Sequence, residues 1–326
     1  MKEFFPSRFI RHHYYQTYFG SKKKRKKEYN QFIKRSILQI FECSDGTKLQ
    51  YSSTLPKDKK FQSVFILLHG WEGSMESSYI LETGFQFFQK GCKIIRVNYR
   101  DHGDTHSWNR EPFHAARLSE IYEFVDFVIK QHLDLPVVLV GFSLGGSFAI
   151  RIALKQSKEK KKWKNLQKIF SISAPLEPLD STILMDSHWL LGPFFKKTWG
   201  ESLELKQKYF PDSFAYSNIL KKKNVFEMTK ELVDTTDVYE NVFEYFRDYT
   251  ILPSMIPKIK VPLYLLSALD DPIIRAKGYL KLQETKFVKI ELTKFGGHNG
   301  FLENRKGDRY FVEVIARESG LWSSQS

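Results

Sequence analysis

One short motif constrains the fold of this chain more than any other feature. Residues 141–145 have the pattern G-x-S-x-G, follow the apolar run Leu135–Val140, and precede a stretch, 147–154, with the composition of a helix. A serine on a sharp strand-to-helix turn needs small residues two positions before and after it, so that strand and helix can approach closely. The helix N-terminus then points free backbone N–H groups at the group that the serine attacks. The motif in this context predicts Ser143 as a nucleophile rather than a structural serine on a glycine-rich turn.

A serine nucleophile of this kind needs an acid and a histidine further along the chain, in that order. Residues 262–268 read as a buried strand that ends at Asp270 and Asp271, and His298 follows the next predicted strand in a glycine-rich loop. We predict that His298 takes the proton from Ser143 and that Asp271 orients the imidazole. Asp270 is the alternative acid, and Asp271 is favoured because it stands directly before a proline. A structural loop histidine is the alternative for His298, and its neighbouring glycines argue against it.

Acyl transfer also needs donors for the oxyanion that develops on the substrate. Residues 64–68 read as a buried strand, and His69, Gly70 and Trp71 follow it. A loop of this type presents one backbone N–H to the substrate carbonyl, and the residue after the nucleophile presents the other. We therefore predict that the N–H groups of Trp71 and Leu144 form the oxyanion hole. His69 is expected to be structural, and the alternative for the whole segment is a simple turn.

The strands and helices alternate along most of the chain, which predicts a mostly parallel sheet covered on both faces. Residues 1–35 are basic and aromatic and are expected to form an arm or short helix packed on the domain. The main α/β domain is placed at 36–326 and opens with a hairpin at 36–51. The alternation stops at about 175–258, which we interpret as a helical cap above the active site. Aromatic side chains of this cap are candidates for an acyl pocket, although for any single one a role only in holding the cap together is favoured: Trp189, Phe194, Phe195, Trp199, Tyr209 and Phe210.

The chain has 326 residues, a net charge of +14 and only two cysteines, so we expect a single large α/β domain with reduced thiols and no disulfide framework. Lysine-rich runs at 22–27, 158–164 and 221–223 carry much of the charge. A solvated surface is the favoured interpretation, and contact with anionic lipid is the first alternative. No nucleic-acid-binding motif accompanies the charge, so no nucleic-acid partner is expected. The chain shows no apolar stretch of bilayer length and no secretory signal, which predicts a cytoplasmic protein with peripheral membrane contact left open.

Together these segments resemble the α/β-hydrolase superfamily, and within it the YheT-like esterase branch. The resemblance covers nearly the whole chain, and the matching segments are 13–17, 69–74, 78–79, 98–100, 141–146, 259–262, 268–272 and 296–301. It implies a serine hydrolase that cleaves carboxylic esters without a metal or cofactor, with Ser143, Asp271 and His298 as its triad. The segment 101–104 departs from the family pattern, and its charges are expected to be structural. Trp71 stands where the family often has leucine, which implies a narrower acyl pocket.

Several functions share this machinery and stay open at this stage. An acyltransferase, a lipase or a phospholipase would use the same triad on lipid esters, and some eukaryotic members of the family do so. An aminopeptidase would need an acidic anchor for the substrate amine, for which Glu177, Asp180, Asp186 and Glu201 are available. A non-catalytic binding module is disfavoured because such proteins usually lose a triad residue. Fold-level analogy does not identify the substrate.

Overall fold

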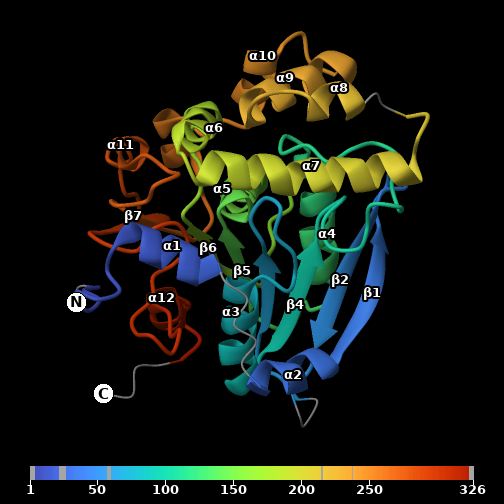
Figure 1. Ribbon diagram of the computed structural model, residues 1–326. Helices are drawn as coiled ribbons and strands as arrows, with labels where there is room; N and C mark the ends of the chain where they lie inside the picture. The colour runs from blue at the N-terminus through green and yellow to red at the C-terminus, as the bar shows by residue number, and fades with distance from the viewer. Residues whose placement is uncertain (1–3, 22–26, 57–59, 214–215, 237, 323–326) are drawn as a thin grey trace.

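An eight-stranded sheet forms the centre of the molecule (Figure 1). The computed structural model describes residues 4–21, 27–56, 60–213, 216–236 and 238–322. The strands lie in the order β1-β2-β4-β3-β5-β6-β7-β8, with β2 antiparallel to both of its neighbours and the remaining pairs parallel. Their bounds are β1 Ser36–Glu42, β2 Lys48–Thr54, β3 Val64–Leu68, β4 Lys93–Asn98, β5 Val137–Phe142, β6 Leu166–Ile172, β7 Leu263–Ala268 and β8 Val288–Thr293.

The predicted N-terminal hairpin is confirmed as β1 and β2. Their register runs from Ser36 opposite Thr54 to Glu42 opposite Lys48. Gly46 lies in the turn with φ +83°, a backbone conformation that side chains disfavour. The Asp-Gly pair in the sequence therefore marks the turn for a physical reason.

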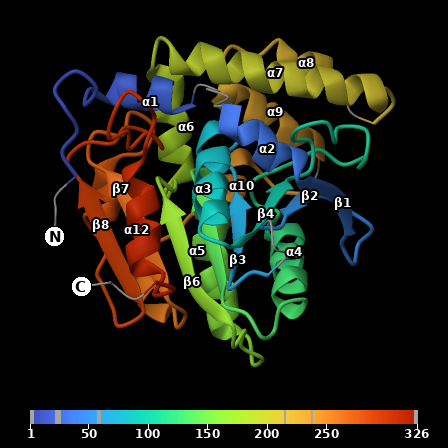
Figure 2. The same ribbon diagram turned by 90° about the horizontal axis from the view of Figure 1, so that it is seen from below.

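Helices cover both faces of the sheet, as the continuous apolar strands predict (Figure 2). In β3, Val64, Ile66 and Leu68 belong to one buried cluster, together with α4 (Leu118–Lys130) and α5 (Leu144–Lys158). The alternate residues Phe65 and Leu67 belong to a second cluster on the other face. This cluster includes residues of α3 (Ser78–Gln89) and α12 (Tyr310–Glu318). The predicted mostly parallel sheet between two helical layers is confirmed.

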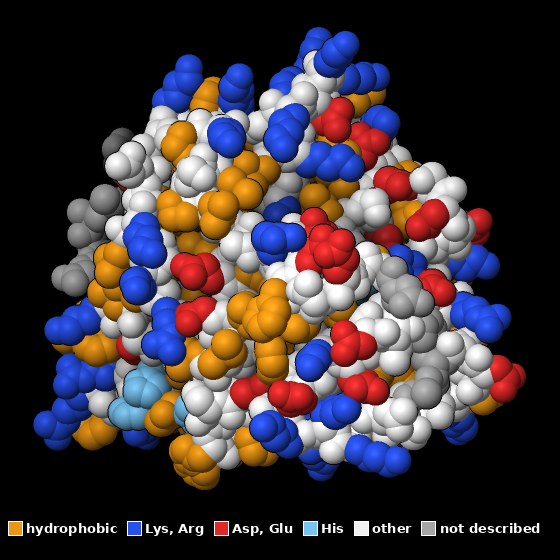
Figure 3. Space-filling model, turned by 90° about the horizontal axis from the view of Figure 1, so that it is seen from above, with side chains coloured by type: hydrophobic (Ala, Val, Ile, Leu, Met, Phe, Trp, Pro, Cys, Tyr) orange, Lys and Arg blue, Asp and Glu red, His pale blue; other side chains and the backbone are white. Residues whose placement is uncertain are grey.

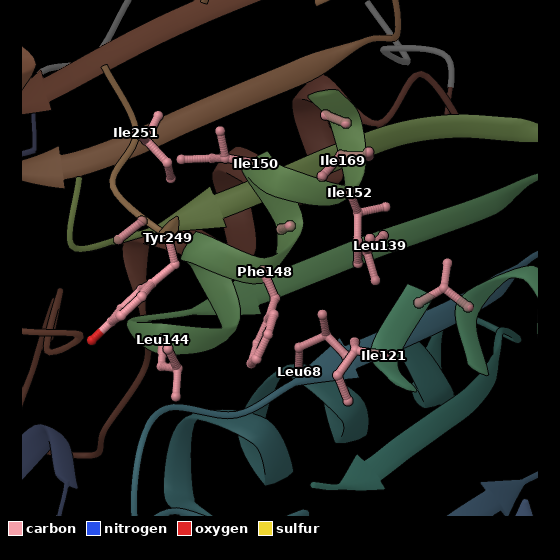
Figure 4. Close-up of a cluster of buried hydrophobic side chains, with 14 of the residues drawn as sticks. Leu68, Ile121, Leu139, Leu144, Phe148, Ile150, Ile152, Ile169, Tyr249 and Ile251 are labelled. Carbon is pink, nitrogen blue, oxygen red and sulfur yellow. The ribbon is translucent and has the colours of Figure 1, made fainter. Parts of the chain in front are cut away.

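The packing of α5 against the sheet matters for function because this helix begins next to Ser143. Its residues Phe148 and Ile152 lie against Leu68, Leu139 and Ile121, and all five are buried (Figure 4). Complete burial of an aliphatic or aromatic side chain contributes about 1.5–3 kcal/mol. The start of α5 is therefore held by the core of the domain rather than by the loop alone.

The segment between β6 and β7 is helical and lies above the sheet in Figure 1. It has its own buried cluster, which includes Met185, Trp199, Leu203 and Tyr216. This confirms the predicted helical insertion between the strand that follows α5 and the strand that ends before Asp271. Its elements are α6 Pro178–Ser187, α7 Leu191–Tyr209, α8 Tyr216–Leu220, α9 Val225–Thr236, α10 Val242–Asp248 and the 3₁₀ helix η1 Pro253–Lys258.

The N-terminal segment contains two short helices, α1 (His13–Ser21) and α2 (Lys27–Lys34). Phe32 of α2 is fully buried in the cluster that also contains residues of α3. Most of the first lysine-rich run, residues 22–26, lies outside the described residues. None of the helices in the described ranges is long and apolar enough to cross a bilayer.

Candidate active site

Ser143 occupies a strained turn between β5 and α5. Its backbone has φ +53° and ψ −117°, a conformation that costs about 1–3 kcal/mol for a residue with a side chain. Glycine is required two residues before and two residues after Ser143. A Cβ atom on Gly141 would lie 2.0 Å from the carbonyl oxygen of Gly145, and a Cβ on Gly145 would lie 2.4 Å from that of Leu68. The Ser143 N–H donates to the carbonyl of Ile172 at 2.8 Å, which ties the turn to β6. The sequence spacing therefore reflects real steric demands.

Of the three residues predicted as a triad, His298 lies within hydrogen-bond distance of both others. His298 Nε2 is 2.9 Å from Ser143 Oγ, and His298 Nδ1 is 2.9 Å from Asp271 Oδ2. The Asp271 side chain is fully buried, and that of His298 is 10% exposed. Nucleophile, base and acid come from the ends of three different strands. Their catalytic roles stay predictions, developed below.

The structure places the two candidate acids differently. Asp271 Oδ1 accepts the N–H groups of Ile273 and Ile274 at 2.8 and 2.9 Å, which leaves Oδ2 for the histidine. Asp270 Oδ1 accepts the N–H of Gly297 at 2.9 Å, and its Oδ2 is buried with no partner among the described residues. Burial, with the neighbouring Asp271 charge, raises the pKa of Asp270 to about 6. Asp271 therefore contacts the histidine, and Asp270 supports the loop that carries it.

The loop predicted to form the oxyanion hole passes directly beside the nucleophile. A Cβ atom on Gly70 would lie 3.1 Å from Ser143 Cβ, and the Gly70 N–H donates to the Tyr79 hydroxyl at 3.0 Å. His69 is fully buried, and burial holds its pKa well below the usual range, so its ring is neutral. Trp71 and Leu144 line the same cavity as Ser143. The two predicted donors thus lie in the wall of the cavity that Ser143 lines.

A cavity of about 400 Å³ lies between the sheet and the helical insertion. Ser143 and His298 are part of its wall, and the rest of the wall is mostly apolar. Of the six aromatic residues predicted to form an acyl pocket, Phe194, Phe195 and Trp199 line the cavity. For the other three the prediction is wrong, since Trp189, Tyr209 and Phe210 are not among the described lining residues.

Trp71 joins the loop beside the nucleophile to the helical insertion. Its indole stacks on Phe195 with ring centroids 5.6 Å apart, and it meets Trp199 edge to face at 5.4 Å. Aromatic pairs in these arrangements contribute about 0.5–1.5 kcal/mol beyond the burial of their surface. The bulky residue that departs from the family pattern therefore forms part of the contact between the domain and α7.

A buried lysine on α7 is a structural feature that the sequence did not reveal. Lys206 is 1% exposed, and its Nζ donates to Asp101 Oδ1 at 2.8 Å and to the carbonyl of Asn109. The other Asp101 oxygen accepts the N–H of Phe113 at 2.8 Å. This ion pair fastens α7 to the loop after β4, in agreement with a structural role for the charges of that loop. A lysine in a lysine-rich helix carries no sequence signal that it is buried.

Glu72 is a second residue in the site that sequence reasoning passed over. It follows Trp71, lines the cavity and has φ +53°. Its backbone N–H donates to His102 Nε2 at 3.2 Å. Burial, with the nearby charge of Asp101, raises the pKa of Glu72 to about 8. This half-buried carboxyl group therefore accepts a proton at a higher pH than an exposed glutamate does.

Metal-binding side chains do not gather at the site. Within the described ranges, no group of three or more histidine, cysteine, aspartate or glutamate residues is arranged to hold a metal ion. Cys43 and Cys92 are free, buried thiols, and burial raises the pKa of Cys92 to about 11. Neither thiol lines the cavity, so neither competes with Ser143 as a nucleophile there.

The chain is similar to several curated proteins along most of its length. It is 24% identical over 317 residues to the monoacylglycerol lipase of Saccharomyces cerevisiae, which covers 91% of this chain and 68% of that protein. It is 22% identical over 275 residues to human phospholipase ABHD3, covering 81% and 66%. YheT of Escherichia coli is 21% identical over 284 residues, covering 81% and 78%. The chain thus spans about two thirds of the length of the first two relatives.

The fold itself has solved counterparts. The crystal structure of the 2,6-dihydroxy-pseudo-oxynicotine hydrolase superposes with a TM-score of 0.57 at 15% identity, covering 88% of this chain and 68% of that one. At this identity the likeness concerns the fold alone. Residues 63–305 match the family described as the alpha/beta hydrolase fold. The resemblance predicted from the motifs is confirmed: the chain belongs to the α/β-hydrolase fold family.

Proposed function

We propose that the protein is a serine hydrolase that cleaves carboxylic esters through an acyl-enzyme intermediate. The hydrogen-bonded chain from Asp271 through His298 to Ser143 carries this proposal. A serine hydroxyl is a weak nucleophile until an adjacent base accepts its proton, and the base works only when a third group orients it. In this chain His298 contacts both other groups, and Ser143 and His298 line one cavity.

The reaction that fits this geometry has two halves. In the first, Ser143 Oγ attacks the ester carbonyl while His298 Nε2 takes the hydroxyl proton and then gives it to the departing alcohol. In the second, water attacks the acyl-enzyme with the same histidine as base, and the carboxylic acid leaves. Asp271 holds the Nδ1–H tautomer and stabilises the imidazolium that forms in each half.

The oxyanion of each tetrahedral intermediate would lie between two backbone donors. The N–H of Leu144 belongs to the first turn of α5, a 15-residue helix whose N-terminal end carries a partial positive charge. The N–H of Trp71 comes from the facing loop. Removing one donor of this kind from a serine protease lowers kcat by about 10²–10³-fold, which sets the scale of their contribution.

The cavity wall favours an apolar acyl group, which makes a lipid ester or another apolar small-molecule ester the proposed substrate class. Phe195, Trp199 and Leu232 contribute apolar surface opposite the nucleophile. Two of the relatives are a monoacylglycerol lipase and a phospholipase, which supports lipid esters in particular. An acyltransferase remains the main alternative because the same acyl-enzyme can react with an alcohol.

A series of p-nitrophenyl esters from acetate to palmitate tests the proposal. Each methylene that enters the cavity contributes about 0.8 kcal/mol, so kcat/KM is expected to rise about fourfold per added methylene until the acyl chain fills the available space. Absence of hydrolysis at every chain length would contradict the proposal. Repeating the best substrate with added glycerol distinguishes hydrolysis from transfer, because a transferase forms a glycerol ester in place of the free acid.

Peripheral contact with an anionic membrane is part of the proposal. Phe194 lines the cavity yet is 58% exposed, Trp189 is 78% exposed, and the ring of Tyr14 lies 5.1 Å from that of His188. Seen from above, hydrophobic side chains gather on this face among lysine and arginine side chains (Figure 3). Aromatic side chains suit the interface of a bilayer, and basic ones are attracted to anionic lipid.

Co-sedimentation with vesicles tests this contact. Vesicles that contain anionic lipid are expected to pellet the protein at low salt, and zwitterionic vesicles to pellet less of it, since the attraction to basic side chains is screened as salt rises. Glutamate in place of Trp189 should weaken the binding without changing hydrolysis of a soluble ester. Equal pelleting by both kinds of vesicle would argue against the electrostatic part of the contact.

A further inference from the structure

The helix α1 lies against the loop that carries His298, although the two are far apart in the sequence. Two glycines of the loop allow backbone to meet backbone. A Cβ atom on Gly297 would lie 2.7 Å from the carbonyl oxygen of His13, and a Cβ on Gly300 would lie 2.5 Å from that of Gln16. The glycines around the histidine therefore serve a second purpose, which is to accommodate α1.

Gln16 ties the middle of α1 to the loop. Its side chain is fully buried, and its amide bonds to both backbone groups of Leu302. The Nε2 group donates to the Leu302 carbonyl at 3.1 Å and to the Ile10 carbonyl at 2.8 Å, while Oε1 accepts the Leu302 N–H at 2.6 Å. A buried amide that is satisfied in this way is costly to displace, because its partners would lose their hydrogen bonds too.

Arg309 ties the end of α1 to the same loop. One amino group of the buried guanidinium donates to the carbonyls of Asn299 and Gly300 at 3.0 Å each. The other donates to the carbonyl of Gly20 in α1 at 2.7 Å. Ser78 Oγ also donates to that carbonyl at 2.6 Å. Arg309, at the start of α12, thus holds both α1 and the loop that carries His298.

Between these ties, α1 touches the histidine itself. Thr17 Oγ1 accepts the backbone N–H of His298 at 2.9 Å, and Thr17 is buried and lines the cavity. The loop needs such support because Gly297 and Asn299, on either side of the histidine, have φ of +52° and +58°. A non-glycine residue such as Asn299 keeps this conformation only where its surroundings impose it.

We propose that Thr17 is a positioning residue for His298, so that the N-terminal helix α1 helps to set the geometry of the active site. The inference rests on the proposed serine-hydrolase function. Thr17 acts by fixing the backbone from which the imidazole reaches both Ser143 and Asp271. A misplacement of about 1 Å in a catalytic group can lower the rate by about 10²-fold.

The first test is Thr17→Val, which keeps the shape of the side chain and removes the acceptor. We expect kcat on a soluble p-nitrophenyl ester to fall at least about tenfold with little change in KM, since the wall of the cavity is preserved. The rate of phosphonylation by a fluorophosphonate probe should fall in parallel, because that reaction uses the same base. Thr17→Ser, which restores the acceptor, should recover most of both rates.

Thr285→Val is the matched control. The Thr285 hydroxyl also accepts backbone N–H groups, from Phe287 and Val288 at 3.1 Å each, but it lies in the turn just before β8 and does not line the cavity. All rates are compared per folded molecule, measured by near-ultraviolet circular dichroism. A Thr17→Val variant that changes only the thermal midpoint would show a structural role and overturn the proposal, as would equal losses of rate in Thr17→Val and Thr17→Ser.

The outcome is separable from that of the proposed function. Wild-type protein that neither hydrolyses esters nor reacts with the probe would refute the serine-hydrolase function itself. Wild-type activity that Thr17→Val retains within twofold would refute only the positioning role.

Discussion

Ser143→Ala is expected to lower kcat for ester hydrolysis by about 10⁴-fold or more, since removal of a triad nucleophile leaves only the oxyanion donors and substrate binding. The fold should persist. Alanine has the same Cβ atom, so the strained backbone at this position is unchanged, and the N–H still donates to Ile172. Labelling by a fluorophosphonate probe should disappear along with the activity. The test compares kcat, the rate of probe labelling and the circular dichroism spectrum between the variant and the wild type.

Ser147→Ala is the matched control for this variant. Ser147 lies four residues further along α5, is fully buried, and its hydroxyl has no partner among the described residues. The same chemical change there should leave kcat and labelling unaffected. Full activity in Ser143→Ala, or labelling at the wild-type rate, would place the nucleophile elsewhere in the chain.

The parts of the fold that could be predicted from the sequence depend on local pattern. Continuous apolar strands such as 64–68 indicate a sheet buried on both faces, and the Asp-Gly pair at 45–46 indicates a hairpin. The turn at Ser143 was predictable because its steric demand falls on two glycines at fixed spacing. The meeting of His298 with Asp271 was predictable because parallel strands end at one edge of the sheet.

Features that depend on contacts between distant segments were not predictable. Lys206 pairs with Asp101 across 105 positions, and nothing in a lysine-rich helix distinguishes the one buried lysine. Thr17 meets His298 across 281 positions, and a threonine carries no signal for such a role. The helix α12, which supplies Arg309 at its start, was likewise not predicted. In each case the contact depends on how whole helices and loops pack together. Hydrophobic periodicity and motif spacing in the sequence carry no information about this packing.

The choice between the two neighbouring carboxylates was the sharpest question left by the sequence, and it leads to the second large effect. Asp271→Asn is expected to lower kcat about 10⁴-fold, as the same change does in a serine-protease triad. The asparagine NH₂ would favour the imidazole tautomer with its proton on Nε2, and that nitrogen could then no longer accept the proton of Ser143. Substrate binding should change little, since the carboxylate does not contact the cavity.

Asp270→Asn provides the comparison within the same loop. An asparagine at 270 can still accept the Gly297 N–H through Oδ1, and the oxygen it replaces has no partner among the described residues. Its kcat should therefore stay within a fewfold of wild type. Steady-state kinetics of the two variants on one p-nitrophenyl ester decide the assignment: a large loss at Asp270 with activity kept at Asp271 would reverse it. A large loss at both would mean that the loop, rather than one carboxylate, holds the histidine in place.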